Sequence, residues 1–181
     1  VNIIDKNKKA LNLIKKNIIS FRENNLEGKL KKSLKKNIFL TSDFKYLKNS
    51  KYIFVCIGTP VDKNQKPIVK DFFNIMQFIK NNTNEKQLII IRSSVYPGFV
   101  NFLSKKFKMK NLFYCPERIT QGNSIDELPK IPQIISGIDK KNIDLINKLF
   151  KKICKFIINC EIIEAELAKI FSNVFRYINF S

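Results

Sequence analysis

The sequence predicts an α/β fold in which helices pack on both faces of a doubly wound parallel sheet. Three observations support this fold class. The apolar runs at residues 52–57 and 87–92 show no polar alternation, as expected for parallel strands that are buried on both faces. Segments with apolar residues at helical spacing separate the strand-like runs. Strands and helices therefore alternate along the chain, which is typical of an open parallel sheet.

The chain begins with a strand and two short helices. Residues 1–5 are typical of a strand that ends in an acid, and residues 6–20 carry apolar residues at helical spacing. Leu26, Leu30 and Leu34 mark a short second helix. This order places the acidic end of the first strand just before a helix.

The next elements lead to the clearest strand of the chain. Residues 38–41 predict a short strand, after which Ser42 or Asp43 can cap a brief helix. The strand at residues 52–57 follows and ends at Gly58. A loop is expected from there to about residue 70.

The second half continues the alternation. Pro97 suits the first turn of the helix that follows the strand at residues 87–92. The remaining strands are expected at residues 111–115, 133–137 and 156–158, and the remaining helices at residues 71–81, 139–152 and 161–180.

Composition excludes several classes of site. The chain has 181 residues, 44% of them hydrophobic, which is enough for a folded core. It contains no histidine, and its four cysteines form no CxxC pair, so neither a zinc site nor a histidine-dependent nucleophile is expected. No apolar run approaches the ~20 residues that span a bilayer. We expect a cytoplasmic protein with reduced thiols and no membrane partner.

The net charge of +19 raises the question of nucleic-acid binding. Only four of the 34 basic residues are arginine, the residue that base and phosphate recognition favours. Lysines are spread along most of the chain, and the cluster at residues 29–36 is typical of a solvated helix face. Specific nucleic-acid binding is therefore not expected.

The last helix carries polar groups in one register. Lys169, Asn173 and Arg176 lie at i, i+4 and i+7, so with Glu166 they share one face. This face is either solvated or a clamp for anions and oxyanions. An apolar stripe on the other side is expected to pack on the core, and its members are Leu167, Phe171, Val174, Phe175 and Ile178.

A second candidate segment follows the strand at residues 111–115. Glu117 and Arg118 come directly after this strand, and ligands bind beyond the carboxyl ends of strands in open parallel sheets. We therefore expect Thr59, Ser94 and Glu117 at one edge of the sheet, facing the polar face of the last helix. The alternative is that Glu117 caps a turn.

Five segments along the chain form a recognisable set: Ile3-Ile4-Asp5, Phe54-Val55-Cys56-Ile57-Gly58-Thr59-Pro60, Ile91-Arg92-Ser93-Ser94-Val95-Tyr96-Pro97-Gly98, Cys115-Pro116-Glu117-Arg118-Ile119 with Gly122, and Ala165-Glu166-Leu167-Ala168-Lys169 with Asn173 and Arg176. Taken together, these motifs resemble the UDP-glucose/GDP-mannose dehydrogenase family of nucleotide-sugar dehydrogenases. The form of the segment around Glu117 is most similar to the UDP-N-acetylmannosamine branch.

The resemblance implies a Rossmann-like NAD-binding domain over residues 1–160 and the start of a long interdomain helix over residues 161–181. It implies NAD-dependent oxidation of the C6 alcohol of a UDP-sugar to a uronate with two NAD, for polysaccharide precursor synthesis. The implied substrate is UDP-N-acetylmannosamine, and the implied assembly is a homodimer or a larger homo-oligomer.

The resemblance also implies residue roles. Asp5 is similar to the acid that binds the ribose hydroxyls of NAD, and Thr59 and Ser94 match positions where a hydroxyl meets the cofactor. It assigns catalytic roles to Glu117, Lys169 and Asn173, and substrate contacts to Arg118, Ile119 and Arg176.

Some features depart from the family pattern. No GxGxxG occurs in the 181 residues, and Gln121 stands where the UDP-glucose branch has a second glutamate. Cys115 matches no nucleophile position. We therefore expect an internal fragment that is inactive alone, with a sheet interrupted between residues 1–5 and 52–57. The alternative is a non-catalytic Rossmann-like binding module with affinity for polyanions.

Overall fold

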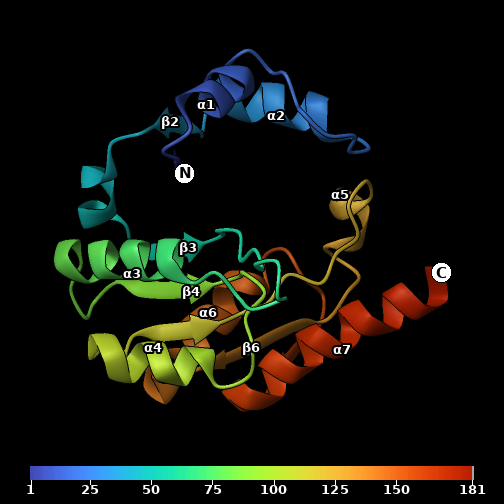
Figure 1. Ribbon diagram of the computed structural model, residues 1–181. Coiled ribbons are helices and arrows are strands. Elements are labelled where there is room, and N and C mark those ends of the chain that lie inside the picture. The colour runs from blue at the N-terminus through green and yellow to red at the C-terminus, as the bar shows by residue number, and fades with distance from the viewer. Residues whose placement is uncertain (181) are drawn as a thin grey trace.

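Strands and helices alternate along the chain in the computed structural model (Figure 1), which describes the backbone of residues 1–180 and the side chains of residues 1–179. Ser181, the last residue of the expected interdomain helix, lies outside the described residues. The strands are β1 Asn2–Ile4, β2 Phe39–Thr41, β3 Tyr52–Val55, β4 Leu88–Ile91, β5 Leu112–Tyr114, β6 Gln133–Gly137 and β7 Ile157–Asn159. The helices are α1 Lys8–Lys15, α2 Leu26–Leu34, α3 Lys70–Asn82, α4 Phe99–Phe107, α5 Ser124–Glu127, α6 Ile143–Phe150 and α7 Ile162–Phe180, with 3₁₀ helices η1 Phe44–Asn49 and η2 Lys140–Asn142.

The main sheet has five strands in the order β3-β4-β5-β6-β7. Its interior strand β4 is buried on both faces, as its continuous apolar run predicts. Ile89 and Ile91 belong to one core cluster, whereas Leu88 and Ile90 belong to the cluster on the opposite face. The alternation of side chains along a strand therefore serves two cores, which confirms the doubly wound α/β class.

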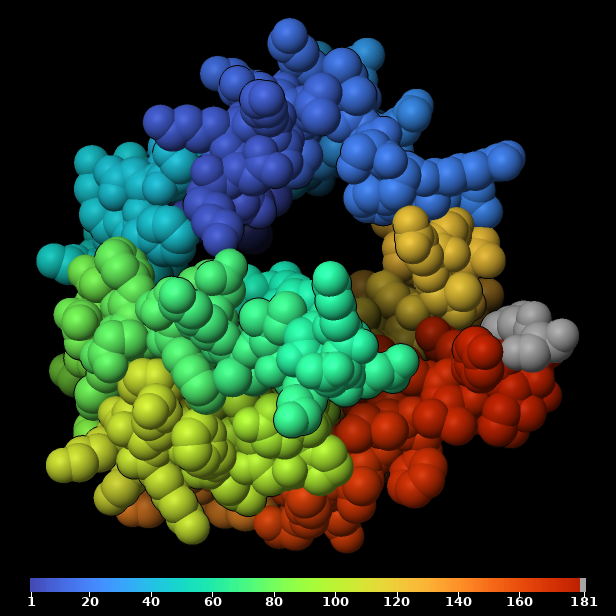
Figure 2. Space-filling view, viewed as in Figure 1, coloured from blue at the N-terminus to red at the C-terminus, as the bar shows by residue number. Residues whose placement is uncertain are grey.

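A second sheet contains only β1 and β2, which pair in parallel. Within residues 1–180 no strand lies between β1 and β3, so the expected interruption of the sheet is confirmed. Figure 1 shows β1, β2, α1 and α2 as a separate layer, and Figure 2 shows an opening between this layer and the main body.

The main sheet is not entirely parallel, because β6 runs antiparallel to its neighbour β5. The connection from β5 to β6 contains only the four-residue helix α5, whereas a parallel crossover needs a connection that crosses the sheet, usually through a longer helix. The pairing also requires a glycine: a Cβ on Gly137 would lie 2.5 Å from the ring of Phe113. The strand β6 therefore begins at the edge where β5 ends.

The first helix is shorter than the predicted residues 6–20. It ends because Asn17 has a left-handed backbone with φ of 58°. The N–H of Ile18 donates to the carbonyl of Leu13 at 2.9 Å, which is the backbone pattern of a helix terminus closed by a left-handed residue. The apolar spacing alone did not indicate where this helix ends.

Among the described residues, none of the helices has the length and apolar character that crossing a membrane requires.

Candidate functional site

Three predicted site residues lie at one edge of the main sheet. Thr59 follows β3, Ser94 follows β4 and Glu117 follows β5, and these three strands run parallel side by side. The Thr59 hydroxyl donates to the carbonyl of Ser94 at 2.6 Å, and the N–H of Glu117 donates to the carbonyl of Arg92 at 3.4 Å. The prediction that they share the carboxyl edge is confirmed.

Glu117 is folded back on its own loop. One carboxylate oxygen accepts the backbone N–H groups of Arg118 at 2.8 Å and Ile119 at 3.1 Å. The other oxygen forms an ion pair with the guanidinium of Arg92. Glu117 therefore shapes the segment that follows β5, and the alternative that it caps a turn describes part of its role.

Arg92 is a site residue that the sequence analysis did not identify. Its side chain is only 11% exposed, and its second amino group donates to the amide oxygen of Gln133 at 3.1 Å. Its guanidinium carbon lies 5.4 Å from the ring centre of Phe150. Burial lowers the pKa of the Arg92 guanidinium. The sequence feature that could have revealed Arg92 is its position directly after a buried strand, at the carboxyl edge of the sheet where ligands bind.

Helix α7 is tied to the same loop by two cations. The Lys169 ammonium donates to the carbonyl of Glu117, and the guanidinium of Arg176 donates to the carbonyls of Ile119, at 3.1 Å, and Arg118. The expectation that this helix face meets the loop is confirmed for both cations. An ammonium has three donors, so Lys169 keeps donors beyond this bond.

Lys169 lies in a strongly basic environment. Its side chain is buried, and burial is the main cause that lowers its pKa. The neighbouring cations Arg176, Arg118 and Arg92 lower the pKa further. Such a cluster favours a bound anion, because a negative charge offsets the mutual repulsion of the cations.

Glu166 fixes the start of α7 on the domain. It is fully buried, and its carboxylate accepts the N–H groups of Gly98 at 2.6 Å and Val100 at 2.9 Å. These groups lie at the beginning of α4, where backbone donors have no helical acceptor. Burial raises the pKa of the Glu166 carboxyl. The helical spacing predicts Glu166 on this face but indicates no role for it.

The expectation that the apolar stripe of α7 packs on the core is wrong. The stripe residues are exposed, with 67% exposure for Phe171 and 69% for Phe175, whereas Ile162 and Ala165 are buried against the domain. The face of α7 that carries Ile162 and Ala165 therefore packs on the domain. Asn173 is also exposed and is not brought to the loop with the two cations.

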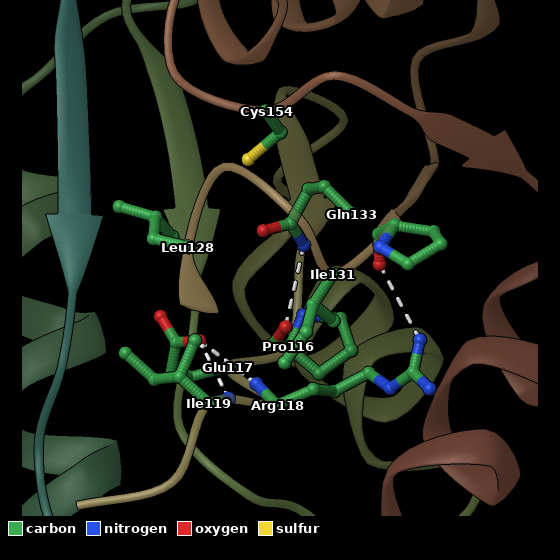
Figure 3. Close-up of a pocket in the computed structure, with 9 residues that line it drawn as sticks. Pro116, Glu117, Arg118, Ile119, Leu128, Ile131, Gln133 and Cys154 are labelled. Carbon is green, nitrogen blue, oxygen red and sulfur yellow. Dashed lines mark hydrogen bonds between the residues drawn. The ribbon is translucent and has the colours of Figure 1, made fainter. Parts of the chain in front are cut away.

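A small pocket lies beneath the loop (Figure 3). Arg118 reaches across it and donates to the carbonyl of Pro132 at 3.4 Å, while Gln133 donates to the carbonyl of Pro116 at 3.3 Å. The Nε of Arg118 is buried and has no hydrogen-bond partner among the described residues. It is therefore an unsatisfied buried donor within this loop. Thr59 and Ser94 do not line this pocket.

The far end of the loop is held by the N-terminal layer. The carboxylate of Glu23 accepts the N–H groups of Gly122 at 2.9 Å and Ser124 at 2.6 Å. The side-chain hydrogen bond with Ser124 is the largest cause that lowers the pKa of Glu23. The loop therefore has fixed ends: Arg92 holds its beginning and Glu23 holds its end.

Asp5 lies away from these residues, at the end of β1 in the two-stranded sheet. Its carboxylate is exposed and accepts the backbone N–H of Asn7 at 2.8 Å. An exposed acid at the carboxyl end of a parallel strand fits the ribose hydroxyls of a dinucleotide. Thr59 and the exposed Ser94 offer hydroxyls at the carboxyl edge of the five-stranded sheet. These three residues fit NAD, although no GxGxxG turn occurs in the sequence.

Cys115 gives no nucleophile at this edge. Burial raises the pKa of the Cys115 thiol to about 12, so the thiol stays protonated and is a poor nucleophile. Among the described residues, no group of histidine, cysteine or acidic side chains is arranged to hold a metal ion.

Comparison with known proteins identifies a family whose NAD binding domain this chain matches. Residues 1–154 match the NAD binding domain of the UDP-glucose/GDP-mannose dehydrogenase family. An uncharacterised protein of Methanocaldococcus jannaschii is 32% identical over 84% of the chain and 18% of its own length. The UDP-glucose 6-dehydrogenase of Rickettsia felis is 23% identical over 97% of the chain and 41% of its own length. The chain thus spans less than half the length of these curated relatives.

Solved structures show the same fold. The UDP-D-ManNAc dehydrogenase of Pyrococcus horikoshii superimposes with a TM-score of 0.90 at 23% identity, covering 99% of this chain and 45% of that chain. The GDP-mannose dehydrogenase of Pseudomonas aeruginosa gives a TM-score of 0.88 at 24% identity, covering 99% of this chain and 45% of that chain.

Proposed function

This chain belongs to the UDP-glucose/GDP-mannose dehydrogenase family, and we propose that it is the cofactor-binding part of an NAD-dependent nucleotide-sugar 6-dehydrogenase. The observation that carries the proposal is the attachment of the α7 cations Lys169 and Arg176 to the loop of Glu117 at the carboxyl edge. A substrate oxygen bound at this edge would be stabilised by this positive charge, which supports the proposal.

The proposed substrate is a UDP-sugar, most specifically UDP-N-acetylmannosamine. The C6 alcohol would give up two hydrides in succession to two NAD, water would supply the second oxygen, and three protons would be released, so that C6 ends as a carboxylate. The loop form around Glu117 supports this sugar, as do the UDP-N-acetyl-D-mannosamine dehydrogenases among the similar proteins. We also propose a cytoplasmic location and a homo-oligomeric enzyme, as the family resemblance implies.

The proposed cofactor contacts come from two layers. Asp5 binds the adenosine ribose, and Thr59 and Ser94 present hydroxyls at the sheet edge. Bound NAD supplies the hydride acceptor. The residues of this chain orient it and define the edge at which it lies. We propose residues 1–160 as the cofactor domain and residues 161–181 as the start of an interdomain helix.

The proposed substrate contacts surround the loop. Lys169 and Asn173 stabilise negative charge on the reacting oxygen, and Glu117 orders water and protons beside it. Arg118 lines the pocket beneath the loop, which supports its assignment as a substrate contact. Ile119 and Arg176 are the other two proposed substrate contacts. The Arg176 guanidinium donates to the Ile119 carbonyl, so the two residues lie together beside Arg118.

The family match favours this function over a non-catalytic binding module. The test is to incubate the full gene product with NAD and UDP-N-acetylmannosamine, then with UDP-glucose, and to follow the absorbance of NADH. Two NADH per sugar are expected with the first substrate. An absence of NADH with both sugars would refute the proposed activity.

Residues 1–181 alone are proposed to be inactive. The sequence holds no glycine-rich turn for a pyrophosphate, and the Cys115 thiol is too strongly protonated to form a thiohemiacetal. The same assay on the purified 181-residue polypeptide checks this. Sustained NADH production by it would show that neither feature is required.

A further inference from the structure

The guanidinium of Arg92 joins three segments that are distant in sequence. It pairs with the carboxylate of Glu117 in the loop and donates to Gln133 at the start of β6. It also lies over the ring of Phe150 at the end of α6. Arg92 itself follows β4 directly, so the contact joins the sheet edge to the loop.

This contact decides where the loop carbonyls point. Arg92 holds one oxygen of Glu117, and the other oxygen then accepts the N–H groups of Arg118 and Ile119. With those N–H groups turned inward, the carbonyls of Glu117 and Arg118, which belong to the same peptide planes, face α7 and accept Lys169 and Arg176. The position of Lys169 therefore depends on a chain of contacts that begins at Arg92.

The planar fork of arginine is suited to this role. Its two terminal nitrogens bond separately to Glu117 and Gln133, and a lysine amine at the same place cannot reproduce that fixed pair of directions. No other cation forms an ion pair with Glu117 among the described residues. Because Arg92 is largely covered, it acts on the site through its neighbours and not by touching a ligand.

We propose that Arg92 is a positioning residue that holds Glu117 in the orientation from which the loop presents Lys169 to the substrate. The kinetic part of this inference rests on the proposed dehydrogenase function. The structural part, which concerns the orientation of Glu117, does not.

The first test measures amide hydrogen exchange in the full gene product by NMR, without any substrate. Arg92→Met should speed exchange at the N–H groups of Arg118 and Ile119 about tenfold, because their acceptor is no longer held. The N–H groups of Gly98 and Val100, which Glu166 accepts, are the internal control and should stay unchanged.

Two further variants separate positioning from general destabilisation. Arg92→Lys keeps the charge and loses the fork, so exchange at residues 118 and 119 should be intermediate. Lys140→Met removes the exposed ion pair with Glu161 and should leave exchange at both residues unchanged. Equal acceleration at residues 98 and 100, or none at residues 118 and 119, would overturn the proposal.

The second test is kinetic. Arg92→Met should lower kcat about 30-fold with an unchanged KM for NAD, and Arg92→Lys should recover part of the loss. In a Glu117→Gln background the further loss from Arg92→Met should be under about twofold, because the two residues act as one unit. Additive losses would overturn the inference. A wild-type enzyme without dehydrogenase activity would refute the proposed function alone, since the exchange test would still decide the role of Arg92.

Discussion

The carboxylate of Glu166 on α7 accepts the backbone N–H of Gly98 at 2.6 Å, where α4 begins. The same carboxylate accepts Val100 at 2.9 Å, so one buried side chain satisfies two donors of another helix. This contact fixes the rotation of α7 and therefore decides which of its faces meets the loop. Glu166 belongs to a segment that resembles the family, and this contact shows that its carboxylate holds the start of α4.

Loss of this contact should reduce stability strongly. Glu166→Ala leaves two N–H groups at the start of α4 without an acceptor, so the free energy of unfolding should fall by about 3 kcal/mol. Urea denaturation of both proteins measures the change. The matched control is Glu85→Ala at an exposed position, which should change stability by less than about 0.5 kcal/mol. Similar values for both variants would contradict this account of Glu166.

The exposure of the apolar stripe predicts a contrast between two positions on α7. Phe171→Ser removes a 67% exposed ring and should change the stability of the 181-residue polypeptide by less than about 0.5 kcal/mol. Ala165→Leu places a large side chain in a fully buried position and should cost about 2 kcal/mol. Thermal unfolding of both variants checks the prediction. A large loss of stability in Phe171→Ser would indicate that the apolar stripe packs on the core, as the sequence predicted.

Lys169 should affect turnover far more than cofactor binding. Lys169→Ala in the full gene product should lower kcat about 100-fold or more, because the ammonium acts on negative charge that develops in the reaction. Asn173 is exposed here, so Asn173→Ala tests whether it joins the site when substrate is bound. Steady-state kinetics with varied NAD and varied UDP-sugar separate the effects. Equal losses in NAD binding and turnover for Lys169→Ala would indicate a structural role.

The sequence predicts those parts of the fold that depend on local pattern. The run of Leu88 to Ile91 has no polar residue, so burial on both faces follows from composition. The strand order then places Thr59, Ser94 and Glu117 at one edge. These inferences hold because strand direction and side-chain alternation follow from the backbone alone.

The remainder depends on contacts between distant segments, which the sequence pattern does not encode. The apolar stripe of α7 suggested the wrong face, because amphipathicity records which side is apolar and not which side is covered. The Arg92–Glu117 pair joins two strand ends through flexible side chains. The reversal of β6 depends on a connection without a crossover helix.

The buried position of Lys169 predicts an unusual dependence on pH. Burial and the neighbouring cations lower its pKa below the ordinary lysine value of about 10.4, so its proton is lost at a lower pH than from an exposed lysine. The protonated form is the one that stabilises an oxyanion, so kcat should fall on the alkaline side, beginning below that ordinary value. A pH profile of kcat in the full gene product measures this limb.

Stability should move in the opposite direction over the same range. Between the lowered folded pKa and the ordinary unfolded pKa, the unfolded chain binds more protons at Lys169, so the unfolding free energy of the wild type should rise with pH relative to Lys169→Met. Lys169→Arg keeps its proton throughout and should remove the alkaline limb of kcat while leaving measurable activity. If the limb persists unchanged in Lys169→Arg, another group titrates there, and the assignment of the oxyanion role to Lys169 fails.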